Sequence, residues 1–85
     1  MTKYCITFRS VTFAQKGQRI LSRAGLDTQL RRTPKGMSHR GCSYCLQLKT
    51  GVATARASEL LRQQGAVFEG IYRTDDRGEV SQWSL

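Results

Sequence analysis

The sequence predicts an α+β fold in which two strand–helix–strand units share one antiparallel sheet. Segments that alternate apolar and polar residues, as half-buried strands do, are interleaved with segments whose apolar residues recur at helical spacing. Each helical segment also ends at a glycine, Gly25 or Gly65, directly before an extended segment. The predicted order along the chain is strand, helix, strand, strand, helix, strand.

In the first unit, residues 4–9 alternate as a strand with one apolar face. A helix over about residues 11–24 follows, and the hydroxyl of Ser10 or Thr12 can cap its first turn. The next strand is predicted at residues 26–31. The apolar stripe expected along this helix consists of Phe13, Gly17, Ile20, Leu21 and Ala24.

The second unit repeats this plan. A strand is predicted at residues 42–48, a helix at about residues 51–64 that opens at Thr50 or Gly51, and a fourth strand at residues 66–72. The stripe of the second helix consists of Ala53, Ala57, Leu60, Leu61 and Gln64. The predicted core of the whole domain consists of Ile6, Phe8, Ile20, Leu21, Leu30, Leu46, Leu48, Leu60, Leu61 and Phe68.

Two right-handed strand–helix–strand units in one sheet give the ferredoxin-like split β-α-β sandwich, with a four-stranded antiparallel sheet and two helices on one face. A thioredoxin-like or other small α/β arrangement has the same order of elements. Residues 1–74 are expected to form this single domain, and residues 75–85 a turn and tail. The tail can fold back as a short extra strand or fray, and its shortness favours fraying.

A chain of 85 residues, 39% of them hydrophobic, is long enough for one small core, so a homodimer is compatible with its expected marginal stability. No apolar stretch is long enough for a membrane helix, and the first residues lack the pattern of a signal peptide. We therefore expect a cytoplasmic protein with no membrane contact, in which all three cysteines are reduced.

The formal net charge of +8 raises the possibility of a nucleic-acid partner, but most of the basic residues are scattered along the chain. The exception is the cluster at residues 31–40, which leads directly to Cys42. There is one histidine and the six acidic residues are dispersed, so neither a paired-histidine metal site nor a Ser–His–acid triad is indicated. No phosphate-binding or dinucleotide motif is present, and no cofactor or metal is expected.

Thiol chemistry at Cys42 is the reactive chemistry that the sequence favours. The loop that precedes it carries Ser38, His39 and Arg40, and Gly41 would let backbone amides approach an anion. The predicted topology also brings Cys42 close to three residues between the first strand and the first helix: Arg9, Ser10 and Thr12. Cationic side chains and a helix N-terminus lower a thiol pKa and so favour the nucleophilic thiolate. The alternative is that Cys42 is a small apolar residue that begins a strand.

Cys42 and Cys45 form a C-x-x-C pair, which is a weak signal for zinc or for a redox disulfide. Zinc would need His39 and Cys5 as further ligands, and residues three apart in a strand point to opposite faces. A Cys42–Cys45 redox pair would require Cys42 to lie in the loop. Cys5 is expected to be a structural thiol, whereas Cys45 is expected on the open sheet face with access to water.

Two segments resemble the selenium/sulfur carrier-like family of small bacterial and archaeal proteins: residues 4–26, and residues 33–44 with Thr33, Pro34, Ser38 and Cys42 at the motif positions. The similarity covers about residues 3–73. Ser43 and Cys45 depart from the family pattern, in which glycine and a small residue are common. The resemblance implies a cysteine that carries selenium or sulfur, and the departure at Cys45 makes a disulfide with Cys42 conceivable in this chain.

Three functions therefore compete. The first is a carrier, rather than a stand-alone enzyme, in which Cys42 receives sulfur or selenium as a persulfide or selenopersulfide and passes it from a donor protein to an acceptor enzyme. The second is a small basic nucleic-acid-binding module, although the open faces of the first and third strands offer no aromatic residue for stacking. The third is an adaptor without chemistry of its own. From charge alone we expect weak, salt-sensitive and non-specific binding to nucleic acid.

Overall fold

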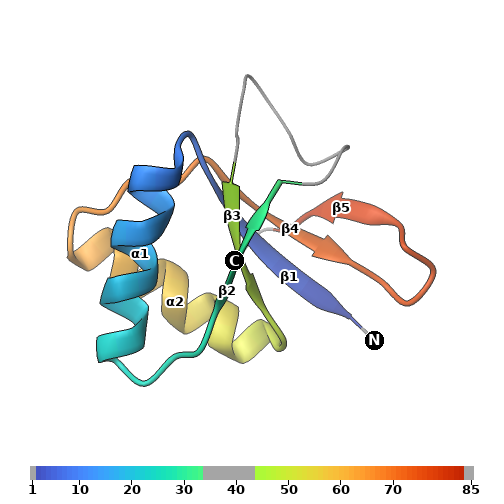
Figure 1. Ribbon diagram of the computed structural model, residues 1–85. Helices are drawn as coiled ribbons and strands as arrows, with labels where there is room; N and C mark the ends of the chain where they lie inside the picture. The colour runs from blue at the N-terminus through green and yellow to red at the C-terminus, as the bar shows by residue number, and fades with distance from the viewer. Residues whose placement is uncertain (1, 34–43, 84–85) are drawn as a thin grey trace.

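The computed structural model describes residues 2–33 and 44–83, and it confirms the α+β class with two helices packed on one face of an antiparallel sheet (Figure 1). The first half contains β1 (Lys3–Phe8), α1 (Val11–Arg23) and β2 (Gln29–Arg32). The second half contains β3 (Tyr44–Leu48), α2 (Gly51–Gln63) and β4 (Gly70–Thr74). A short β5 (Val80–Gln82) follows.

The sheet has five strands in the order β2-β3-β1-β4-β5, and every neighbouring pair is antiparallel. The predicted pairing of the first and third strands is confirmed, whereas the predicted total of four strands is wrong. The expectation that the tail frays is also wrong for residues 80–82, which pair with β4. The N–H of Trp83 donates to the carbonyl of Ile71 (2.8 Å), and the Trp83 ring lies 4.9 Å from that of Tyr4. This aromatic contact packs the residue that follows β5 against β1.

A side-chain N-cap fixes the start of each helix. Ser10, rather than Thr12, caps α1, and its hydroxyl accepts a hydrogen bond from the N–H of Phe13 (3.4 Å). Thr50, rather than Gly51, caps α2 in the same way through the N–H of Ala53 (3.1 Å). Both hydroxyls satisfy an amide that has no partner within its helix.

The strands that follow the helices start later than predicted. The segments expected at residues 26–31 and 66–72 pair in the sheet only at Gln29–Arg32 and Gly70–Thr74. These strands start late because the chain first completes the helix ends, where Gly25 and Gly65 adopt φ of 81° and 71°. The N–H groups of the next residues then turn back to the carbonyls of Leu21 and Leu61. The residue after each glycine is thus hydrogen-bonded to the helix and not to a neighbouring strand.

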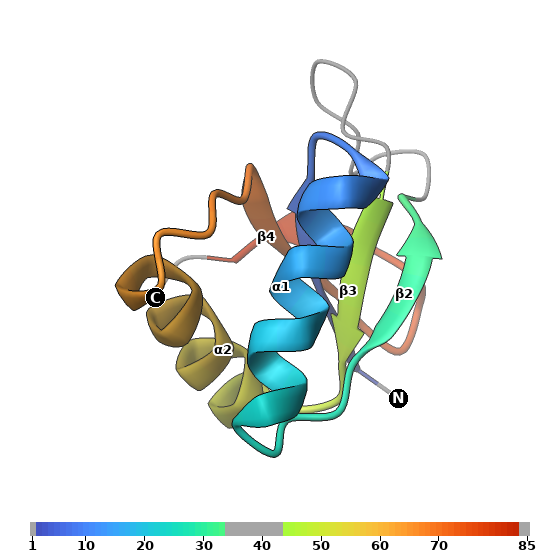
Figure 2. The same cartoon turned by 60° about the vertical axis from the view of Figure 1, so that its left-hand side comes forward.

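The core lies between the helices and the sheet (Figure 2). Most predicted core residues are buried, and Ile20, Leu30, Leu60 and Phe68 are partly buried at its edge. The stripe predicted for α1 was misplaced at Phe13, which is 46% exposed, because Ala14, Gly17 and Leu21 form the buried row. The buried residues of α2 likewise include two polar ones, Thr54 and Ser58.

The two halves are related by an offset of 40 residues. This offset carries β1 onto β3 and α1 onto α2, including both caps and both glycines with positive φ. Tyr4-Cys5 corresponds to Tyr44-Cys45. Ile6 and Leu46 are equivalent under the offset and also directly paired in the β1–β3 ladder, so a local twofold axis passes between them.

Candidate functional site

The predicted nucleophile, Cys42, lies outside the described residues, and so do four of the residues expected to support it: Ser38, His39, Arg40 and Gly41. The structure does describe the residues that flank this segment. The candidate site is therefore built from the end of β2, the start of β3 and the β1–α1 connection.

These three parts meet at one end of the sheet. Tyr44, which begins β3, pairs with Phe8 at the end of β1 and with Arg32 at the end of β2. The chain leaves Phe8 through Arg9 and Ser10 and enters α1 at Val11. The start of β3 and the N-terminus of α1 accordingly lie at the same end of the molecule (Figures 1 and 2).

The first turn of α1 presents a positive helix end. Its residues 11–14 include no acidic side chain that would neutralise the dipole. Thr12, one of the predicted supporting residues, is exposed in this turn. The cap hydroxyl of Ser10 is occupied by the N–H of Phe13, so Ser10 acts here by fixing the helix start.

Arg9, a further predicted supporting residue, is engaged elsewhere. Its Nε donates to Oε1 of Glu69 at 3.0 Å, and its side chain is 73% exposed. An exposed pair of this kind is weakly held. Arg32, which was predicted only as part of the basic cluster, adds a second cation at this end of the sheet because its strand pairs with the start of β3.

The other two cysteines form a separate pair on the open face, which we define as the sheet face opposite the helices. Cys5 of β1 and Cys45 of β3 contact each other and are 5% and 1% exposed, with the partly buried ring of Tyr72 packed against them. The predicted placement of Cys45 on the open face agrees with this, but its predicted access to water is wrong. Neighbouring side chains on the same face cover its sulfur.

A hydrogen bond between the two thiols shifts their pKa values in opposite directions. The Cys45 thiol donates to the Cys5 sulfur, and this bond holds the pKa of Cys5 below its usual value against the opposing effect of burial. Arg31 and Lys3 lower it further through their charges. The pKa of Cys45 is raised, first by the same hydrogen bond and then by burial. The first proton leaves this pair more easily than the second, as in any coupled pair of acids.

Tyr72 was missed as an open-face aromatic residue, since only the first and third strands were considered. Its position opposite Cys5 in the β1–β4 ladder places it on that face. Correct bounds for β4 would have revealed it. A single, partly buried ring is still not the set of exposed aromatics that base stacking needs.

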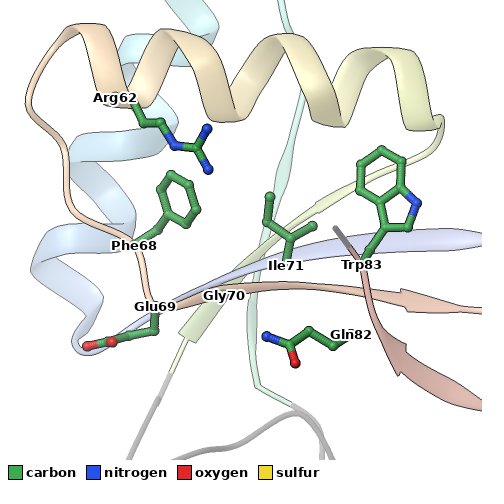
Figure 3. Close-up of a pocket in the computed structure, with 7 residues that line it drawn as sticks. All are labelled: Arg62, Phe68, Glu69, Gly70, Ile71, Gln82 and Trp83. Carbon is green, nitrogen blue, oxygen red and sulfur yellow. The ribbon is translucent and has the colours of Figure 1, made fainter. Parts of the chain in front are cut away.

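A surface groove lies between α2 and the strands β4 and β5 (Figure 3). Phe68, Ile71 and Trp83 point toward the helix, and the guanidinium of Arg62 lies 5.6 Å from the centre of the Phe68 ring. Glu69 and Gln82 point away from this apolar row (Figure 3). The groove is formed by packing residues and contains no nucleophile.

Within residues 2–33 and 44–83, no three His, Cys, Asp or Glu side chains gather closely enough to hold a metal ion. Neither of the two described helices is long and apolar enough to cross a membrane.

Comparison with known proteins finds one family model, described as "Putative Se/S carrier protein-like", which matches residues 3–73. Searches for similar curated proteins and for similar solved structures found no match. The matched range includes both strand–helix–strand halves except Thr74, the last residue of β4, and it includes the cysteine motif but not β5.

Proposed function

The chain belongs to the Putative Se/S carrier protein-like family, and from this premise we propose that it carries sulfur or selenium on Cys42. The thiolate of Cys42 attacks the outer sulfur of a donor persulfide, the donor's S–S bond breaks, and the donor leaves as a thiolate. Cys42 then bears a persulfide, whose outer sulfur passes to an acceptor enzyme by the same type of exchange. A selenopersulfide would form and react in the same way.

One structural observation carries the assignment to Cys42: β3 begins beside the N-terminus of α1. Cys42 precedes Tyr44 by two positions, and that length of chain spans at most about 7 Å. The unneutralised first turn of α1 is thus close enough to contribute positive potential to a thiolate at Cys42. Arg40, next but one in the sequence, supports the same effect.

The two remaining cysteines are poor alternatives for this role. A carrier thiol must meet the active-site cysteine of a donor protein, which needs an exposed sulfur. Cys5 and Cys45 are both buried, and Cys45 also has a raised pKa. Their burial therefore favours Cys42 as the thiol that exchanges with partner proteins.

The topology is compatible with the ferredoxin-like split β-α-β arrangement for the first four strands. Their order and antiparallel pairing support this assignment, and β5 would be an addition at the β4 edge. Such an arrangement puts the end of β2 and the start of β3 at the same end of the sheet.

The proposal is tested by intact-mass analysis of protein purified without reductant and then incubated with a cysteine persulfide or a selenopersulfide donor. We expect one added sulfur or selenium atom, located by peptide mass on Cys42. The matched control is Cys42→Ser, which should gain none while keeping the circular dichroism spectrum of the parent. Added chalcogen on Cys42→Ser, or none on the parent, would show that the carrier assignment is wrong.

A further inference from the structure

We propose that Cys5 and Cys45 form a second, independent thiol site, which a small hydroperoxide oxidises to a reversible disulfide between β1 and β3. This inference does not rest on the carrier role of Cys42. It assigns Cys45 a different partner from the one that the C-x-x-C spacing indicates.

The geometry brings these two sulfurs together across the sheet. In the β1–β3 ladder Cys5 is opposite Gln47, and Cys45 is opposite Thr7, so the two cysteines are diagonal neighbours on the open face. They are in side-chain contact and form their own small buried cluster with Tyr72. They are also equivalent under the 40-residue offset, one on each side of the local twofold axis at Ile6 and Leu46.

The surroundings of the two thiols support different roles for them. One thiol attacks the peroxide, and the other resolves the product by forming the disulfide. Arg31 lies opposite Cys45 in the β2–β3 ladder, and Lys3 precedes Cys5 by two positions on the same face of β1. Both cations favour a thiolate in the pair, and because the hydrogen bond from Cys45 lowers the pKa of Cys5, we assign Cys5 as the attacking sulfur. Cys45 stays protonated and supplies the hydrogen bond. A thiolate next to a second thiol is the arrangement that redox-active pairs use.

The chemistry balances with hydrogen peroxide as the oxidant. The Cys5 thiolate attacks one peroxide oxygen, the O–O bond breaks, and hydroxide leaves and takes up a proton as water. The resulting Cys5 sulfenic acid is attacked by the sulfur of Cys45, which loses its proton. The S–O bond breaks, a second water leaves, and the S–S bond forms. Two thiols have been oxidised and one peroxide reduced to two waters.

The diagonal register makes this bond easy to reverse. Diagonal neighbours in an antiparallel sheet have Cα atoms about 7–8 Å apart. Unstrained disulfides usually join Cα atoms about 4.4–6.8 Å apart. Closing the bond must therefore draw the two strands together, and strained disulfides are more readily reduced. We expect a cellular dithiol or glutathione to return the pair to its reduced form.

Peptide mapping of the full chain provides a direct test. Trypsin cuts the sequence so that Cys5 lies in peptide 4–9, whereas Cys42 and Cys45 share peptide 41–49. After treatment with hydrogen peroxide the protein is denatured, and its free thiols are capped with N-ethylmaleimide. We then expect peptides 4–9 and 41–49 to be joined through Cys45. The joined peptides should lack the mass of two hydrogens and carry no N-ethylmaleimide on Cys5 or Cys45. Glutathione should restore the labels on Cys5 and Cys45.

Two variants sharpen the test. In Cys42→Ser the Cys5–Cys45 link should form as in the parent, which separates this inference from the carrier proposal. In Cys45→Ala the resolving thiol is gone, so sulfenic acid at Cys5 should persist and react with dimedone. A bond within peptide 41–49 of the parent, or free Cys5 and Cys45 after peroxide, would overturn the proposal. The parent's peptide map decides the question even if a variant fails to fold.

Discussion

The two halves of this protein share one backbone plan but fill it with different side chains. β1 ends in Phe8 and α1 carries Gly17, whereas the equivalent positions of the second half are Leu48 and Ala57. A Cβ added at Gly17 would lie only 3.0 Å from Cζ of Phe8 and 3.3 Å from Cδ2 of Leu61. The first half thus combines a large strand residue with a helix residue that has no side chain. In the second half the strand residue, Leu48, is smaller than Phe8, and the helix residue, Ala57, carries a methyl group.

The halves also differ in where their helix N-termini lie. The N-terminus of α1 is at the end of the sheet where β3 begins. The N-terminus of α2 is at the other end, where a Cβ at Gly51 would meet the hydroxyl of Tyr4 at 3.3 Å and the Trp83 ring at 3.4 Å. Aromatic side chains crowd the α2 end. This comparison shows how a duplicated plan can leave only one of two similar helix ends beside the start of β3.

The largest expected effect tests whether the two halves contribute equally to one core. Leu21 and Leu61 are equivalent and completely buried. Leu21→Ala and Leu61→Ala should each lower the free energy of unfolding by about 2–5 kcal/mol, because each removes buried methyl groups and leaves a cavity. Urea denaturation followed by circular dichroism measures both losses. A loss confined to one variant would mean that the halves fold as unequal units.

A smaller effect is expected where the halves differ in packing. Gly17→Ala improves helix propensity by about 1 kcal/mol. It also overpacks the contact with Phe8, at a typical cost of about 1–3 kcal/mol. We expect a net destabilisation of about 1 kcal/mol.

The matched test is the double variant Phe8→Leu/Gly17→Ala, which gives the first half the residues of the second. Phe8→Leu alone should be destabilising because the shorter side chain leaves space beside Gly17. The added methyl group fills part of that space, so the double variant should be more stable than the sum of the single changes predicts. Strictly additive losses would show that these two positions are not coupled.

The helices and the central strands were predictable because their signals are local. Ser10 and Thr50 are standard caps, and Gly25 and Gly65 are standard stops. The pairing that joins the first and third strands also followed from the two-unit pattern. β5 was not predictable in this way, because it is held by Trp83 against Tyr4, nearly the whole chain away.

The candidate site was predicted only in part. The convergence of the start of β3 with Ser10 and Thr12 followed from strand order alone. The burial of Cys45 did not, because an uncovered sheet face is normally expected to be wet. Contact with Cys5 and Tyr72 depends on the register of three strands, and a shift of one residue would move every side chain to the other face. Nor could sequence spacing reveal that Arg9 pairs with Glu69, 60 residues away.

The smallest predicted effect distinguishes the two helix N-termini by their influence on the alkylation rate of Cys42. Ser10→Ala and Thr50→Ala should each cost about 1 kcal/mol of stability, since each removes a side-chain cap. Only Ser10→Ala should also change Cys42, because loosening the first turn of α1 weakens its positive end. A contribution of about 0.3–1 kcal/mol to the thiolate corresponds to about two- to fivefold slower alkylation of Cys42 by iodoacetamide near pH 7. Above the pKa of an ordinary thiol the difference should disappear, because Cys42 is then ionised in every variant.

The variant Ser10→Asp separates the effect of the helix cap on stability from the effect of charge at the helix N-terminus on Cys42. Aspartate caps a helix as well as serine does, so stability should be retained. Its carboxylate, however, neutralises the helix end and repels a nearby thiolate, which should raise the pKa of Cys42 and slow its alkylation below pH 8. Peptide mass after timed alkylation gives the rate at each cysteine, and Cys5 and Cys45 should stay slow in all variants because they are buried. If Thr50→Ala slowed Cys42 as much as Ser10→Asp, the effect would come from general loosening of the fold, and the N-terminus of α1 would have no special role.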